Sequence, residues 1–174
     1  MRSIFHCGIV ALLLASSSTT QTAAWREATP SELASVVPSR ASVVGERIET
    51  EARTASGIVD RHGRFIAGAV LITAGYSAEG KYSHYLSVQA PIEIGGVLLK
   101  PGEYVFGWDR IDAQDALRIH FNEAATGKLI GIATARRISG SSRVESLRIW
   151  PPAEKSVVQI GRFGLPYRIP GNRR

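Results

Sequence analysis

Apolar and polar residues alternate along the second half of the chain, and this alternation predicts β-strands. Four segments show it, at residues 103–110, 117–123, 129–138 and 144–150. Turn-forming residues rich in glycine, proline, serine and aspartate separate the segments. Because the connections are short, we expect an antiparallel meander in which each strand pairs with the next.

The register of this meander follows from matching apolar residues across neighbouring strands, since a slip of one residue would move every apolar side chain to the other face. The best match sets Trp108 opposite Ile119 and Phe106 opposite Phe121. Continued through the next two turns, the match pairs Phe121 with Ile130, Ile119 with Ile132, Ile132 with Ile149 and Thr134 with Leu147. The predicted core face therefore consists of Tyr104, Phe106, Trp108, Ile119, Phe121, Ile130, Ile132, Leu147 and Ile149.

The opposite face of the meander carries the candidate functional residues. The same registers place Gly107, His120, Gly131 and Trp150 in one row, and Asp109, Arg118, Ala133 and Arg148 in the next. The predicted site is a shallow patch, in which Trp150 stacks on a flat or sugar-like ligand and the two arginines bind an anionic or hydroxyl-rich group. The structural alternative is that Trp150 covers Gly131, and that Asp109 pairs with Arg118 rather than with His120.

The first half of the chain predicts one helix and further strands. Residues 29–32 (TPSE) have the form of a capping box, so we expect a short helix that ends before Pro38. Residues 44–53 alternate apolar with charged residues, which is typical of a half-exposed edge strand. Residues 65–74 are apolar on both faces and predict a central, covered strand. Shorter strands are expected at 82–90, 92–99, 157–160 and 162–169.

Together these elements predict an all-β fold. The doubly covered central strand favours an antiparallel two-sheet β-sandwich, and a closed up-and-down β-barrel is the alternative. The segment Leu99-Lys100-Pro101-Gly102-Glu103-Tyr104 resembles the start of a strand in prealbumin-type and carboxypeptidase-regulatory-like β-sandwich modules, and in secreted bacterial all-β domains of unknown function. This resemblance covers six residues; it implies a sandwich and assigns no functional residue.

The N-terminus predicts export. Met1-Arg2, a short apolar run and a small-residue segment ending at Ala23-Ala24 form the pattern of a secretory signal peptide, with cleavage after Ala24. We therefore expect a signal peptide at residues 1–24, a single domain at 25–170 and a frayed basic tail at 171–174, in a periplasmic or extracellular protein. Cleavage would remove Cys7, the only cysteine, and no second apolar run suggests a membrane span.

The net charge of +6 comes mostly from arginines that are dispersed along the chain rather than gathered into a tract. This distribution argues against a nucleic-acid groove, although it permits loose attraction to anionic envelope surfaces. The histidines lack the spacing of metal ligands, and Asp109, Asp112 and Asp115 lack the alternate spacing of a calcium loop. No metal or cofactor is expected.

Three functions stay open. The first is a non-catalytic binding or structural module, whose patch of His120, Trp150, Arg118, Arg148 and Asp109 contacts an envelope polymer, a glycan or another protein. The second is a small hydrolase or isomerase that uses His120 as a general base, with Asp109 or Glu145 nearby. The third is a barrel that carries a small apolar ligand. Residues 75–80 lack the spacing of a hydrolase nucleophile elbow, so we expect a plain loop there.

Overall fold

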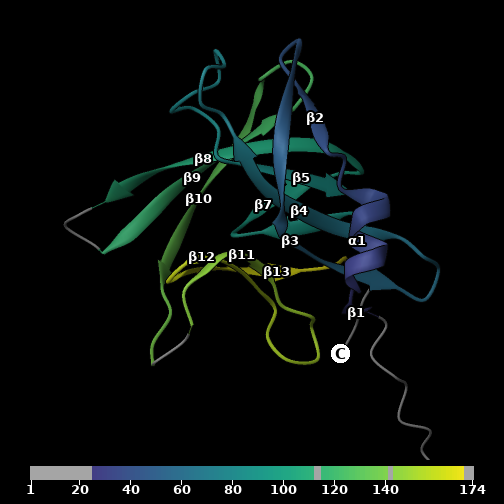
Figure 1. Cartoon of the computed structure of the whole chain (residues 1–174). Helices are drawn as coiled ribbons and strands as arrows, with labels where there is room; N and C mark the ends of the chain where they lie inside the picture. Colours follow the sequence, from purple (N-terminus) through teal and green to yellow (C-terminus); the bar gives the residue numbers. More distant parts are fainter. Residues whose placement is uncertain (1–24, 112–114, 141–142, 171–174) are drawn as a thin grey trace, which may run out of the picture.

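The computed structural model describes residues 25–111, 115–140 and 143–170; the predicted signal peptide, Cys7, Asp112 and the predicted tail lie outside these residues. The described chain contains a single helix, α1 (Pro30–Val36), and is otherwise built from strands. In chain order the strands are β1 (Trp25–Glu27), β2 (Arg40–Val43), β3 (Glu46–Asp60), β4 (Phe65–Ile72), β5 (His84–Val88), β6 (Ile92–Ile94), β7 (Val97–Leu99), β8 (Gly102–Ile111), β9 (Ala116–Glu123), β10 (Leu129–Arg137), β11 (Glu145–Ile149), β12 (Val157–Gly161) and β13 (Phe163–Arg168) (Figure 1). The prediction of an all-β fold with one short N-terminal helix is confirmed.

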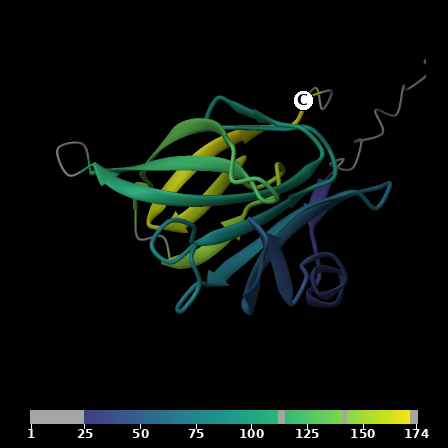
Figure 2. The ribbon, with the colours of Figure 1, turned by 90° about the horizontal axis from the view of Figure 1, so that it is seen from above.

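The strands form one antiparallel sheet that curls into a half-barrel (Figure 2). Its order is β1-β3-β4-β5-β8-β9-β10-β13-β12-β11, with β2 paired to β3 and the β6–β7 hairpin attached to β13. The described residues therefore form one curled sheet and not clearly the predicted sandwich of two sheets. The barrel alternative is not closed either, because within the described residues β1 pairs only with β3 and β11 only with β12.

Contacts that involve side chains, rather than strand pairing, join β11, the last strand of the sheet, to β1 and β3 at its other end. The backbone N–H of Ile149 in β11 donates to the Oγ of Ser56 in β3, at 2.9 Å. An ion pair links Arg148 of β11 to Glu27 of β1, at 3.0 Å. The last strand of the sheet is thereby held against its first strands.

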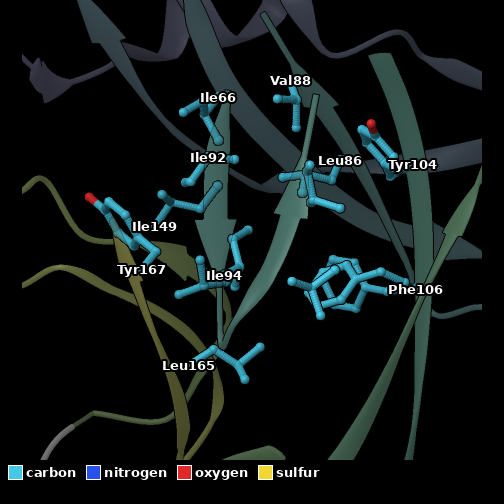
Figure 3. Packing of buried hydrophobic residues seen from close by; sticks show 14 of the residues in the cluster. Ile66, Leu86, Val88, Ile92, Ile94, Tyr104, Phe106, Ile149, Leu165 and Tyr167 are labelled. Carbon is cyan, nitrogen blue, oxygen red and sulfur yellow. The ribbon is translucent and has the colours of Figure 1, made fainter. Parts of the chain in front are cut away.

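The curl creates two hydrophobic cores, one on each face of the sheet. The larger core lies on the inner face, where Ile66 and Leu86 of β4 and β5 meet Ile94 and Leu165 of β6 and β13 (Figure 3). The smaller core lies on the outer face, where α1, β2 and the loop after β4 cover β3 to β5. Complete burial of one aliphatic or aromatic side chain contributes about 1.5–3 kcal/mol, so both cores matter for stability.

Strand β4 confirms the prediction of a central, doubly covered strand. It lies between β3 and β5, and its side chains alternate between the inner core at Ile66 and the outer core at Ala67 and Ala69.

The capping box is also confirmed: the Thr29 side chain accepts from the Glu32 N–H, and the Glu32 carboxylate accepts from the Thr29 N–H. Hydrogen bonds from Arg26 and Thr29 lower the pKa of Glu32 to about 2.

The predicted edge strand at residues 44–53 is wrong in both its start and its place. Val44 and Gly45 have positive φ angles and form a tight turn between β2 and β3. Strand β3 then runs to Asp60 and is paired on both sides, with β4 on one side and with β2 and β1 on the other. Gly45 interrupts the alternation of apolar and charged residues in the segment 44–53, and this interruption marks a hairpin turn, not a strand interior.

The first hairpin of the meander has the predicted register. Trp108 lies opposite Ile119 and Phe106 opposite Phe121 across β8 and β9. Phe106 and Phe121 are 1% exposed and their ring centroids lie 5.4 Å apart. Trp108 is 47% exposed, however, because it lies toward the end of β8, beyond the buried pair Phe106 and Phe121. The β8–β9 hairpin extends away from the rest of the sheet at this end (Figure 1).

The register between β9 and β10 is shifted by one residue from the prediction. A β-bulge between Leu129 and Gly131 sets Gly131 opposite Phe121 and Ile132 opposite His120. The physical reason is the β6–β7 hairpin, which packs on the inner face of β10: a methyl group at Gly131 would lie 2.8 Å from Val97 Cγ1. Only glycine fits there, so Ile130 and Ile132 face outward, with 40% and 50% exposure.

The third predicted hairpin does not form. Strand β10 pairs with β13 at its end, and β11 pairs with β12 and lies against β3. Leu147 and Ile149 are still buried in the inner core, where they pack from the opposite end of the sheet. Of the predicted core residues, Trp108, Ile130 and Ile132 are therefore wrong, whereas the other six are buried: Tyr104, Phe106, Ile119, Phe121, Leu147 and Ile149.

Candidate functional site

The structure divides the predicted patch into two groups of residues. Asp109, Arg118 and His120 lie together on the outer face of β8 and β9. Arg148 and Trp150 belong to β11 and its end, at the far end of the strand order, where they contact β1 and β12. The prediction that both arginines hold one ligand is therefore wrong.

The first group contains a hydrogen-bonded histidine and carboxylate. His120 Nε2 lies 2.8 Å from Asp109 Oδ2, and the two side chains are 33% and 68% exposed. Asp109 and His120 are diagonal neighbours, because His120 lies opposite Gly107 and Asp109 opposite Arg118. The expectation that Asp109 would bond to Arg118 instead is wrong. Among the described residues, Arg118 forms no ion pair with a carboxylate and its side chain is exposed.

The glycines beside His120 do not form an open floor. A methyl group at Gly107 would lie 2.0 Å from the carbonyl oxygen of Lys81, so the loop after β4 crosses the sheet at this point. Gly131 faces the inner core and is covered by Val97, not by Trp150. The neighbour of His120 on β10 is the exposed Ile132 instead. The predicted shallow, small-floored patch is therefore absent at these described residues, and exposed aliphatic side chains of β10 lie beside His120 instead.

Trp150 is held in a cluster of its own. The Arg148 guanidinium lies 4.7 Å and the Lys155 ammonium 4.3 Å from the indole ring, and Trp150 Nε1 donates to Gln159 Oε1 at 3.0 Å. Arg148 is also paired with Glu27. Because cations already lie over the ring, Trp150 does not offer the free stacking surface that a sugar-binding platform needs.

Sequence reasoning missed the aliphatic part of this surface. We define the outer patch as Asp109, Arg118, His120, Ile130 and Ile132, which lie on the outer face of three adjacent strands. Ile130 and Ile132 were assigned to the core, because alternation within a strand cannot reveal a β-bulge in its partner pairing. The only signal was Gly131 between them, since a glycine inside a strand often marks a bulge or a close approach.

His84 and Asp115 have structural roles. His84 is 4% exposed, stacks on Phe106 at 4.7 Å and bonds to Ser83 and to the Ser146 carbonyl, so it is a core histidine whose ring nitrogens both have partners. Burial lowers the pKa of His84. Asp115 pairs with Arg137, and no group of three or more potential metal ligands occurs within the described ranges.

The loop after β4 contains Ser77, which donates a hydrogen bond to a Glu46 carboxylate oxygen. A strand rather than a helix follows this loop, so the expectation of a plain loop is confirmed. In the part of the chain that the structure covers, no helix has the length and apolar character that a membrane crossing requires.

Comparisons with protein families, with curated proteins and with solved structures found no match to this chain.

Proposed function

We propose that the chain is an exported, non-catalytic binding module that contacts a partner protein through the outer patch. The observation that carries this proposal is the pair of exposed aliphatic side chains, Ile130 and Ile132, next to the His120–Asp109 hydrogen bond. Isolated exposed aliphatic residues are common, but neighbours on one rigid sheet face, flanked by polar groups, have the composition of a protein interface.

The chemistry of the outer patch favours a protein over a glycan. Glycan binding was predicted from an indole available for stacking, and the Trp150 ring is occupied by Arg148 and Lys155. The outer patch offers aliphatic contact area, an exposed guanidinium at Arg118 and an imidazole, which together suit apolar and acidic side chains. A partner protein supplies both.

Export is part of the proposal and is supported by the sequence of residues 1–24. Trp25, the first residue after the predicted cleavage position, is 3% exposed and packs in the inner core. Mass spectrometry of the protein recovered from the medium or periplasm of an expressing cell would test this part. A mature chain that begins at Trp25 is expected; an uncleaved chain that stays in the cytoplasm would contradict it.

The binding test compares outer-patch variants with a matched surface variant. We would replace Ile130 and Ile132 by serine, and Ile72 by serine as the control, because Ile72 is 42% exposed on β4 and lies outside the outer patch. Tagged proteins would be incubated with the envelope fraction of the exporting cell, and retained proteins identified. A partner retained by the wild type and by Ile72→Ser, but lost with the outer-patch variant, is expected. Equal retention by all three proteins would overturn the proposal.

One observation favours an enzyme as the second candidate. The Asp109 carboxylate orients the His120 imidazole at 2.8 Å, which is the arrangement that a histidine general base requires. A hydrolase or isomerase of this kind would turn over an ester, glycoside or peptide substrate and lose that activity in His120→Ala, whereas the binding module would show no turnover in either protein.

A further inference from the structure

Strand β10 has an open backbone edge beside the outer patch. It pairs with β9 along residues 129–136, but on its other side it pairs with β13 only at Arg136 and Arg137. In an antiparallel sheet every second residue directs its N–H and C=O away from a given neighbour. Between residues 129 and 135, no other described strand pairs with the groups that point away from β9. This part of β10 can therefore accept an additional strand.

The side chains along this edge do not protect it. Exposed edge strands usually carry charges or prolines that discourage pairing with another chain. Residues 129–135 (LIGIATA) contain neither, and Leu129, Ile130 and Ile132 are 48%, 40% and 50% exposed. The β6–β7 hairpin contacts β10 on its inner face, at Gly131 and Ala133, and so covers the face rather than the edge.

Basic residues flank the uncharged stretch. Lys128 precedes it and Arg136 follows it, and Arg118 lies opposite Thr134 on β9. All three side chains are exposed, and none of them forms an ion pair with a carboxylate among the described residues. Other basic residues of this region are already paired, as Arg137 is with Asp115. The edge thus combines an apolar centre with exposed positive charge at both ends.

We propose that β10 binds an extended segment of the partner protein by strand addition, and that this segment has apolar alternate residues with acidic residues at its ends. This inference rests on the proposed function and adds the form and charge of the bound segment. Backbone hydrogen bonds to the open edge supply affinity, and the exposed aliphatic residues of β10 contact alternate side chains of the bound segment. Lys128 and Arg136 pair with the acidic side chains at the two ends of that segment.

The same charges disfavour a second copy of the chain as the occupant. If two β10 strands paired antiparallel about Ile132, Lys128 of each copy would lie opposite Arg136 of the other. Like charges directly opposite each other destabilise a strand pair. An acidic segment removes this conflict and forms ion pairs at the same positions.

The test uses the mature chain and a pair of synthetic peptides. Both peptides have alternating valine and threonine residues; one carries glutamates and the other lysines at both ends. Affinity would be measured by fluorescence anisotropy at low and high ionic strength, and amide hydrogen exchange would be followed along β10. Ile132→Lys places a charge on the edge strand, and Ile72→Lys is the matched control on β4.

The expected result is about tenfold tighter binding of the glutamate peptide than of the lysine peptide, with the difference shrinking at high ionic strength. When the glutamate peptide is bound, the amide hydrogens of β10 that point away from β9 should exchange with solvent more slowly. The substitution Ile132→Lys should weaken binding of the glutamate peptide, and Ile72→Lys should leave it unchanged.

Three results would overturn the inference: equal affinity for both peptides, no binding, or binding without protection of β10. A dimer that forms with rising protein concentration and protects the same amides would overturn it as well, since the occupant would then be a second copy. If the Ile130 and Ile132 serine variant still loses the envelope partner in these cases, the proposed function stands and only strand addition is wrong.

Discussion

His120 and Asp109 are hydrogen-bonded across two strands although neither lies directly opposite the other. The bond is diagonal. The direct partner of His120 is Gly107, which has no side chain, so the imidazole extends toward Asp109, two residues further along β8. Diagonal neighbours lie within reach of long side chains in an antiparallel pair. Because both groups are accessible to solvent, this bond belongs to the surface chemistry of the protein and not to its core.

We predict that Asp109→Asn leaves stability nearly unchanged. Exposed hydrogen-bonded pairs of this type contribute about 0–1 kcal/mol, because water screens the charge and competes for the bond. Urea unfolding should therefore give a free energy within about 1 kcal/mol of the wild type. The imidazole nitrogen resonances of His120 should shift, because its orienting acceptor changes. A larger loss of stability would show that the pair has a structural role.

We predict that His84 makes stability depend on pH. Burial lowers the pKa of His84, so the unfolded chain binds a proton more readily than the folded protein. The contribution of neutral His84 is fully present above the unfolded pKa of about 6.5, and it is lost as the pH falls from there toward the folded pKa. Urea unfolding at about pH 8 and about pH 5 would measure this loss.

The variant His84→Phe keeps the aromatic stack on Phe106 but cannot take up a proton. Its unfolding free energy should fall less between the two pH values than that of the wild type. His62→Gln is the matched control, because His62 is exposed in the turn after β3. If His84→Phe and the wild type lose the same free energy on acidification, the assignment to His84 is wrong.

We predict that Gly107→Ala is destabilising, whereas Gly102→Ala is tolerated. A methyl group at Gly107 would meet the Lys81 carbonyl oxygen at 2.0 Å, and backbone cannot move aside cheaply. A methyl group at Gly102 meets only the Tyr104 ring, at 3.6 Å, which is ordinary contact. We expect a loss of about 1–3 kcal/mol or more for Gly107→Ala. For Gly102→Ala the change should be within about 0.5 kcal/mol. Equal melting temperatures of the Gly107→Ala and Gly102→Ala variants would contradict the crossing of the loop over β8.

We predict that Ser56→Ala weakens the link between β3 and β11. Ser56 is 8% exposed, and its hydroxyl accepts from the Ile149 N–H at 2.9 Å. Alanine would leave a buried backbone donor without a partner, which costs about 1–3 kcal/mol. Ser35→Ala is the control, since Ser35 is exposed on α1. Faster amide exchange at Ile149 in Ser56→Ala is the specific readout; unchanged exchange there would contradict the role of this bond.

The elements that could be predicted from the sequence are those set by local pattern. The capping box at Thr29 and the central strand β4 depend on neighbouring residues alone, and the β8–β9 register depends on a short hairpin with an aromatic pair. The outer β2–β3 hairpin was missed because the turn at Val44-Gly45 interrupts the alternation by a single step.

The remainder depends on contacts between segments that are distant in the chain. Gly131 faces inward because Val97 packs against it, and the sequence of β10 alone does not predict that contact. Likewise, β11 leaves the meander because it packs on β3 and pairs with β12. For the candidate site, the neighbourhood of Asp109, Arg118 and His120 was predictable from the first hairpin. The separation of Trp150 and Arg148, and the exposure of Ile130 and Ile132, were not.

The position of β11 against β3 also determines when the fold can become complete. The bond from Ile149 to Ser56 spans 93 residues, and the inner core combines side chains from β3 and β4 with those from β11 to β13. A chain whose synthesis or transport has delivered only its first two thirds lacks the residues that close this core. Contacts so distant in sequence slow the search for the native state, so folding should finish only after the C-terminal strands arrive.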